Sequence, residues 1–218
     1  MIRKIFLILL TLTFLASAGY AKKEKTVKIK DMLATDLKYG WKMPVPDNWK
    51  AKNQDEPNVE RLFLEQKNYR VNPNISQYGG DYTIPRVIIY VQEFGGTVDD
   101  FENLIKKSLE EHRTDNEIIS KMGLLQDGDY IVSADVTRDS SLVRQIYLKR
   151  NYKRLLYIPD SGGGISGGRE EYINDHEVHE VYLIKHGSYM LVFQAFCERE
   201  FYDSNAVEFQ AMMKSLEF

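Results

Sequence analysis

Two histidines separated by two residues mark the part of the sequence best suited to metal chemistry. His176 and His179 lie in the segment DHEVHE, directly after Asp175. Imidazole nitrogens and carboxylate oxygens are zinc ligands, and a zinc ion usually takes three or four ligands from the protein. On a helix or a loop this spacing brings both rings to one side, whereas on a strand they face opposite ways. Asp175, His176 and His179 are therefore candidate metal ligands, and a hydrated polar strand end is the alternative interpretation.

A glycine-rich run, SGGGISGG, occupies residues 161–168. Backbone amides of such a run can bind phosphate, but no Gly-Lys-Ser/Thr follows and no helix pattern begins after it. Ser166 also satisfies the G-x-S-x-G pattern of hydrolases, which requires a strand leading into the serine and a helix leaving it. The flanking residues predict neither element. We interpret the run as a connection between strands, and we expect neither enzymatic activity nor a cofactor.

Four cations with one tyrosine between them form a third candidate site. Lys149, Arg150, Lys153 and Arg154 surround Tyr152 in the sequence KRNYKR. Tyrosine and arginine are enriched where proteins meet, so these residues are candidate contacts for an anionic partner. The alternative is an exposed sheet edge, where charge prevents unwanted strand pairing.

Cys197 is the only cysteine in the chain. A disulfide within the chain is therefore excluded, although an exported protein would meet an oxidising compartment. The thiol closes an apolar run, which predicts a buried and inert side chain. A reactive thiol or a bridge to another molecule is the alternative.

The elements that must position these residues are clearest near the C-terminus. Residues 179–185 and 188–197 are apolar and strand-like, and His186-Gly187-Ser188 between them is typical of a tight turn. Apolar residues then recur at steps of three and four, which predicts a terminal helix capped by Asp203 or Ser204.

The rest of the chain predicts more strands than helices. A helix over residues 97–111 begins at Thr97, where Asp100 completes a capping box. Trp41 and Trp49 flank two prolines and predict a core contact of aromatic rings. The expected strands span residues 61–66, 86–94, 117–125, 129–137, 142–150 and 153–158, and residues 67–83 form a long loop. This order predicts an α+β fold with a mainly antiparallel sheet.

The N-terminal 21 residues have the composition of a secretory signal peptide. Arg3 and Lys4 precede an apolar run that is too short to cross a bilayer comfortably, and small residues allow cleavage after Ala18 or Ala21. No cysteine stands there for a lipid anchor. We expect a basic leader at residues 22–37, a single domain at 38–218, and a periplasmic or secreted mature chain without a transmembrane segment. An uncleaved N-terminal anchor is the alternative.

The chain has 218 residues and a net charge of −3, which argues against a nucleic-acid partner because such binders usually carry a basic footprint. The segment WKMPVPDNW at residues 41–49 resembles the opening of the PsbP/Mog1-like group, which includes bacterial secreted members of unknown function. Residues 181–193 and 209–218 resemble the closing hairpin and helix of the same group. This resemblance implies an α/β/α sandwich around an antiparallel sheet and an accessory or binding role.

The sequence therefore favours an exported, non-catalytic domain that contacts an unidentified protein or envelope component. The alternative function is a carrier of a small ligand or metal ion that uses the glycine-rich run and the region of His176 and His179.

Overall fold

A computed structural model describes residues 26–53, 59–67, 69, 84–110, 119, 122, 128–138, 141–159 and 168–218. The main elements, in chain order, are β1 (Val27–Lys30), β2 (Leu33–Asp36), β3 (Lys42–Pro44), β4 (Trp49–Asn53), β5 (Glu60–Gln66), β6 (Arg86–Glu93), α3 (Val98–Glu110), β7 (Gly128–Arg138), β8 (Ser141–Pro159), β9 (Gly168–His186), β10 (Tyr189–Glu198) and α5 (Arg199–Lys214). The predicted signal peptide, most of the 67–83 loop and Ser166 lie outside the described residues.

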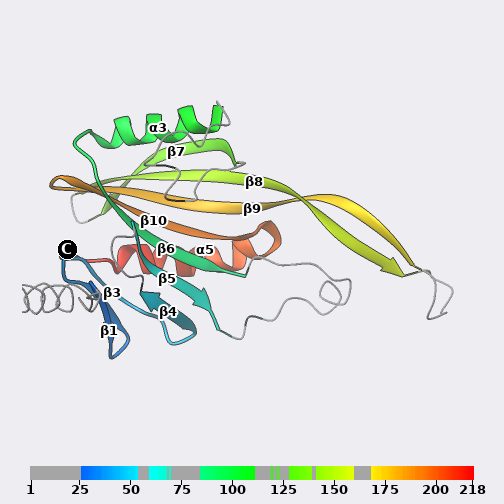
Figure 1. The fold of residues 1–218 in the computed structure, drawn as a ribbon, viewed down its shortest axis with the longest axis horizontal. Helices are drawn as coiled ribbons and strands as arrows, with labels where there is room; N and C mark the ends of the chain where they lie inside the picture. The colour runs from blue at the N-terminus through cyan, green and yellow to red at the C-terminus, as the bar shows by residue number, and fades with distance from the viewer. Residues whose placement is uncertain are drawn as a thin grey trace, which may run out of the picture.

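One large antiparallel sheet organises the molecule. Its strand order is β4-β5-β6-β10-β9-β8-β7, and every neighbouring pair is antiparallel. The β9–β10 hairpin turns at Gly187, whose φ of 56° is the left-handed conformation that the predicted turn requires. The predicted α+β class with a mainly antiparallel sheet is confirmed (Figure 1).

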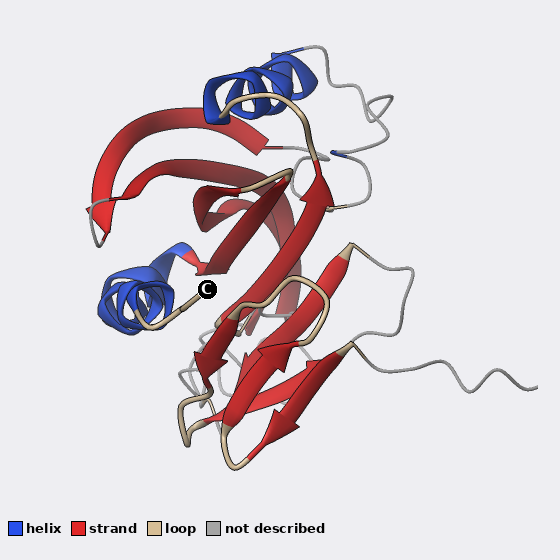
Figure 2. Cartoon of the chain, turned by 90° about the vertical axis from the view of Figure 1, so that its left-hand side faces the viewer, coloured by secondary structure: helices blue, strands red, loops and turns tan. Residues whose placement is uncertain are grey.

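The sheet is buried on both faces because its central strands are apolar at successive positions. In β6, Val87 and Ile89 belong to the core beneath α5, whereas Ile88 and Tyr90 belong to the core beneath α3. Alternate residues of a strand point to opposite faces, so such a strand needs a cover on each side. Figure 2 shows the curved sheet passing between the two helices, which makes the α/β/α sandwich.

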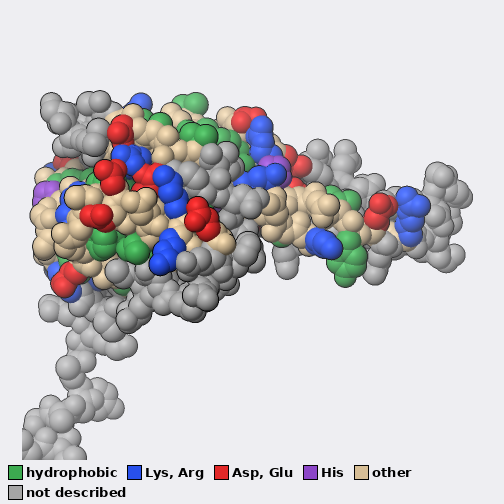
Figure 3. Space-filling model, turned by 90° about the horizontal axis from the view of Figure 1, so that it is seen from above, with side chains coloured by type: hydrophobic (Ala, Val, Ile, Leu, Met, Phe, Trp, Pro, Cys, Tyr) green, Lys and Arg blue, Asp and Glu red, His purple; other side chains and the backbone are tan. Residues whose placement is uncertain are grey.

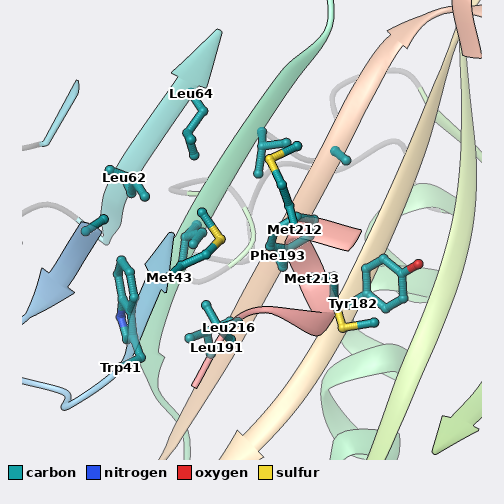
Figure 4. Packing of buried hydrophobic residues seen from close by; sticks show 14 of the residues in the cluster. Trp41, Met43, Leu62, Leu64, Tyr182, Leu191, Phe193, Met212, Met213 and Leu216 are labelled. Carbon is teal, nitrogen blue, oxygen red and sulfur yellow. The ribbon is translucent and has the colours of Figure 1, made fainter. Parts of the chain in front are cut away.

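Two tryptophans anchor the core beneath α5, as the sequence predicts. Trp41 and Trp49 are both buried, and the Trp49 ring meets the Phe209 ring of α5 edge-on at 6.2 Å. Figure 4 shows Trp41 beside Met43, with the α5 residues Met212 and Met213 across the same cluster. Burying large apolar side chains of this kind is the main favourable term in folding.

A second sheet, β1-β2-β3, is built partly from the range predicted as a basic leader. Asp31 and Met32 make the two-residue turn between β1 and β2 with φ of 50° and 58°, the positive values that tight hairpins need. Val27 and Ala34 are buried, so the described part of residues 22–37 belongs to the fold rather than preceding it.

The two helix starts differ in how well local sequence predicts them. The Thr97 backbone N–H donates to Asp100 Oδ2 at 2.8 Å, and the Asp100 N–H donates to Thr97 Oγ1 at 3.1 Å, so the predicted capping box of α3 is confirmed. α5 begins at Arg199 after Glu198, which makes no side-chain capping bond. The predicted caps Asp203 and Ser204 are therefore wrong and lie inside the helix, because β10 continues almost directly into it.

Two strands are much longer than the sequence predicts. The separate strands expected at 142–150 and 153–158 form one continuous strand, β8, and β9 begins at Gly168 rather than at His179. Of the strand expected at 117–125, the structure describes only Ile119 and Met122, and both are buried. The glycine-rich run stands between β8 and β9 in the chain, and residues 160–167 lie outside the described residues.

Candidate functional site

The ends of β8 and β9 form a two-stranded extension that we call the arm. It consists of residues 151–159 and 168–176, which pair with each other from Asn151 opposite His176 to Pro159 opposite Gly168. In the body of the protein β8 also pairs with β7 as far as Arg150, and β9 pairs with β10 as far as Glu177. Nine residues of strand span about 30 Å. The arm therefore projects well beyond the helices (Figure 1).

The candidate partner-binding residues sit at the base of the arm, and the strand divides them between two faces. Arg150 and Tyr152 share the face of the core residue Leu148, beneath α3, whereas Lys149 and Lys153 lie on the opposite face. The side chain of Arg154 lies outside the described part of the structure. The five residues thus do not make one patch: each side of the arm base receives part of the predicted charge.

Two of the candidates already contact carboxylates of the same chain. Arg150 Nη1 lies 3.6 Å from Glu177 Oε2, and the Tyr152 hydroxyl donates to Glu198 Oε2. Both carboxylates are buried, whereas half of the Arg150 side chain is exposed. These contacts hold the base of the arm against the body. Viewed onto the α3 side, basic and histidine side chains gather where the body meets the arm (Figure 3).

His179 is a buried residue of the sheet with both ring nitrogens engaged. Its Nε2 lies 3.2 Å from Glu177 Oε2, and its Nδ1 lies 2.8 Å from the side-chain nitrogen of Gln194. A carboxylate only accepts, so Nε2 carries the proton and Nδ1 accepts from the amide. The ring also stacks on Phe196, with centroids 4.9 Å apart. This environment fixes the ring inside the protein, as expected of a structural histidine.

The other two candidate metal ligands lie elsewhere. His176 is three residues from His179 on one strand, so its side chain leaves the opposite face of the sheet. Burial lowers the pKa of His176, and the nearby cations Lys149 and Arg199 lower it further. Asp175 Oδ1 accepts from the His176 backbone N–H at 2.8 Å. Across the described ranges, no group of three or more His, Cys, Asp or Glu side chains could hold a metal ion.

A buried carboxylate that the sequence does not point to lies on the α5 side of the sheet. Glu180 is fully buried, and its oxygens receive hydrogen bonds from Tyr182 and from Tyr202, the latter at 3.0 Å. The side-chain nitrogens of Gln145 and Gln210 lie 2.6 Å and 3.4 Å from Oε1. The only available sequence signal is an acid between apolar strand residues, because the donors come from three separate elements.

The tyrosines around this carboxylate have altered acidity. Burial raises the pKa of Tyr182 and of Tyr202, and the Glu180 charge raises both further. The pKa of Tyr147 is raised for the same two reasons, in the same order. These hydroxyls are thus held as neutral donors. The cluster suits the stabilisation of one buried charge and the attachment of α5 to the sheet, and it contains no activated nucleophile.

Cys197 is buried, and burial followed by the charges of Glu198 and Glu177 raises the pKa of its thiol to about 12. The thiolate is the reactive form of cysteine, so a raised pKa keeps this side chain inert near neutral pH. The predicted buried thiol is confirmed. Within the described parts of the chain, neither helix is both long and apolar enough to cross a membrane.

No protein-family model matches the sequence, and no curated protein matches it. Comparison of structures gives distant similarities. Cyanobacterial PsbP (CyanoP) from Synechocystis sp. PCC 6803 is 11% identical with a TM-score of 0.47, over 91% of this chain and 95% of that one. The Ran-binding protein Mog1p from Saccharomyces cerevisiae is 9% identical with a TM-score of 0.44, over 87% and 96%.

LpqN from Mycobacterium tuberculosis, which is involved in cell envelope biogenesis, is 11% identical with a TM-score of 0.37, over 81% of this chain and 79% of that one. At these identities and TM-scores the similarity concerns the general fold, and it transfers neither a partner nor a site residue to this chain.

Proposed function

We propose that this protein is an exported, non-catalytic binding domain that contacts a protein or envelope partner through its arm. The observation that carries this proposal is the arm itself: nine residue pairs that leave the body and have no other strand partner among the described residues. A two-stranded ribbon is at best marginally stable in water. An extension of this kind gains little stability by itself and is stabilised when it packs on another surface.

The exposed side chains of the arm are suited to such a contact. Tyr172 is 69% exposed, and Lys153 is exposed nearer the base. Tyrosine is enriched in interfaces because its ring buries a large apolar area while its hydroxyl stays able to form hydrogen bonds. Tyr172 lies midway along the arm, where it pairs with Leu155, so its exposed ring is available to a partner that meets the arm.

Export is the second part of the proposal. The composition of residues 1–21 supports delivery to the periplasm or the exterior, where the partner would be met. Fractionation of cells that express the full chain tests this part: a shorter mature chain outside the cytoplasm is expected, and a full-length cytoplasmic chain would contradict it.

A site-specific photocrosslinker tests the contact. Replacing Lys153 by a photoreactive phenylalanine should give a discrete adduct with one envelope protein after irradiation of whole cells. Val207, which is 77% exposed on α5, is the control position and should give no such adduct. The same adducts from both positions, or none from either, would contradict a contact between the arm and a separate envelope partner.

A further inference from the structure

The two long edges of the arm differ in their fitness to accept another strand. Unpaired N–H and C=O groups on an exposed edge are a template for pairing with a further strand. The β8 edge carries Lys153 and Arg154 and ends at Pro159, which has no N–H to donate. The β9 edge, Gly168–His176, contains no proline and carries both acids and a base. The β9 edge is therefore the one to consider for strand addition.

The charge pattern of the β9 edge is complementary to itself. In an antiparallel pair of identical strands with Tyr172 on the two-fold axis, Arg169 of each copy lies opposite Asp175 of the other. Opposite charges directly across an antiparallel pair are favourable, and so are aromatic pairs such as Tyr172 with its own symmetry mate. Glu171 then lies opposite Ile173, and Glu170 lies opposite Asn174. No like charges are opposed.

The neighbouring registers of the β9–β9 pair do not combine opposed unlike charges with the absence of opposed like charges. Opposing residues of an antiparallel pair point to the same face, so a two-fold axis perpendicular to the sheet must pass through a residue paired with itself. Centring on Glu170 or Glu171 sets two identical carboxylates face to face. Centring on Ile173 opposes Glu171 to Asp175. The register on Tyr172 alone in this stretch opposes unlike charges and avoids like ones.

The Arg169 and Tyr172 side chains are accessible. The Arg169 side chain is 73% exposed, and its Nη2 lies 3.3 Å from Glu171 Oε2 of the same strand. Tyr172 is 69% exposed, and Asp175 is half-buried. Positions 169, 171 and 175 share one face of the strand, so Arg169 could bridge its own Glu171 and Asp175 of a second copy. Tyr172 lies on the other face.

We infer that the β9 edge of the arm pairs antiparallel with the same edge of a second copy of this chain, with Tyr172 at the two-fold axis. The two arms then form one four-stranded ribbon in the order β8-β9-β9-β8, and the second copy gives each β9 strand a strand neighbour that the described residues do not supply along the arm. Such an interface is isologous and closes after two copies. This inference rests on the proposed role of the arm and names a second copy as its partner along β9.

A charge exchange tests the register in the full chain, expressed with its own N-terminal segment. Sedimentation velocity should show a dimer of the wild type that weakens with added salt, because the facing charges are screened. Arg169→Asp and Asp175→Arg each oppose like charges twice, and each should raise the dimer dissociation constant at least about tenfold. The double variant Arg169→Asp with Asp175→Arg should restore the dimer. Lys30→Asp makes the same charge change on β1, at a side chain that is 87% exposed, and should leave the dimer unchanged.

A cysteine on the axis gives an independent readout. Two residues directly opposite in an antiparallel pair have Cα atoms about 4.5–5.5 Å apart, within the range of a disulfide. Tyr172→Cys should form a disulfide dimer under mild oxidation. Val207→Cys, on exposed α5, is the matched control and should stay monomeric on gels, and the native Cys197 is buried.

The outcomes separate this inference from the proposed function. A monomer at every concentration, a dimer that ignores both single charge variants, or equal disulfide formation at positions 172 and 207 overturns the pairing of β9 edges. If the Lys153 adduct persists in a monomer, the contact role stands and only the second copy is excluded. A dimer restored by the charge exchange, without any adduct from Lys153, supports the pairing and removes the separate partner.

Discussion

The Tyr202 hydroxyl of α5 donates a hydrogen bond across 3.0 Å to Glu180 of β9, whose carboxylate is fully buried. Tyr182 of the same strand donates to the same carboxylate, and the Gln145 side-chain nitrogen lies 2.6 Å from it. A buried charge is costly unless hydrogen bonds replace the water it loses. The Tyr202 hydrogen bond therefore both attaches α5 to the sheet and replaces part of the water that the Glu180 carboxylate loses.

Removal of the Tyr202 hydroxyl should show how much this hydrogen bond contributes to the free energy of unfolding. Tyr202→Phe keeps the ring but takes one donor from the Glu180 carboxylate, and a hydrogen bond to a charged group contributes about 1.5–3 kcal/mol. We expect the free energy of unfolding in urea to fall by about that amount. Tyr172→Phe removes a hydroxyl from an exposed ring and should change it by less than about 0.5 kcal/mol. Equal effects of the two substitutions would contradict a special role for the Tyr202 bond.

Stability should fall steeply in alkali because the folded state keeps these tyrosines protonated. The pKa of Tyr182 is raised by burial first and by Glu180 second, so the folded state holds its proton above pH 10, where the unfolded chain releases it. The stabilisation is complete below pH 10 and is lost as the pH rises beyond it, at up to about 1.4 kcal/mol per pH unit for one group. Urea titrations from pH 8 to 11.5 should show this decline. Tyr182→Phe should flatten the slope, and an unchanged slope would assign the decline to other groups.

The features that sequence predicts well are those whose partners are close in the chain. Thr97 and Asp100 cap α3 from three residues apart, and Gly187 makes the turn of the β9–β10 hairpin. The continuous apolar run of β6 predicts a strand, and the structure covers both of its faces. Local geometry decides each of these features, so the residues involved carry the information themselves.

The features that sequence misses depend on partners far away in the chain. Asn151 resembles a turn residue and suggests a break after Arg150, but its pairing with His176 continues β8 without interruption. Tyr182 donates to Glu180 from two residues away, but the donor Tyr202 belongs to α5 and lies 22 residues further along the chain. Tertiary packing sets these contacts and overrides the local preference.

A buried ion pair joins the two sheets, and breaking it should strongly destabilise the fold. Arg61 Nε of β5 lies 2.9 Å from Asp36 Oδ2 of β2, and both side chains are almost fully buried. Asp36 Oδ1 also accepts from the Lys38 and Tyr39 backbone N–H groups. Removing one partner of such a pair leaves an uncompensated charge and costs about 3–5 kcal/mol. We expect Asp36→Ala to lower the free energy of unfolding, measured in urea, by about 3–5 kcal/mol.

The control for this prediction replaces both partners. The double variant Asp36→Leu with Arg61→Met removes the two charges together and should recover much of the stability that Asp36→Ala loses. If Asp36→Ala and the double variant unfold at the same urea concentration, the loss comes from packing or from the turn at Lys38 rather than from the unpaired Arg61 charge.

Zinc should leave the thermal stability unchanged, because the candidate ligands His176 and His179 leave opposite faces of β9. A ligand bound only to the folded state would add about 2.7 kcal/mol at a hundred times its dissociation constant. Thermal melts with and without zinc, at a pH where histidine is neutral, measure this directly. A rise in the melting temperature that disappears in both His176→Ala and His179→Ala would favour the metal-carrier function instead.

Cys197 should resist alkylation until the protein unfolds. Burial raises the pKa of the thiol to about 12, and the side chain is also inaccessible to a reagent. At pH 8 we expect iodoacetamide to leave Cys197 of the folded chain unmodified and to label it fully in denaturing urea. Val207→Cys provides an exposed thiol in the same chain and should react within minutes, at the rate of a free cysteine. Labelling of Cys197 at a comparable rate without urea would show that the end of β10 opens in the folded state, and a reactive thiol would return as a candidate function.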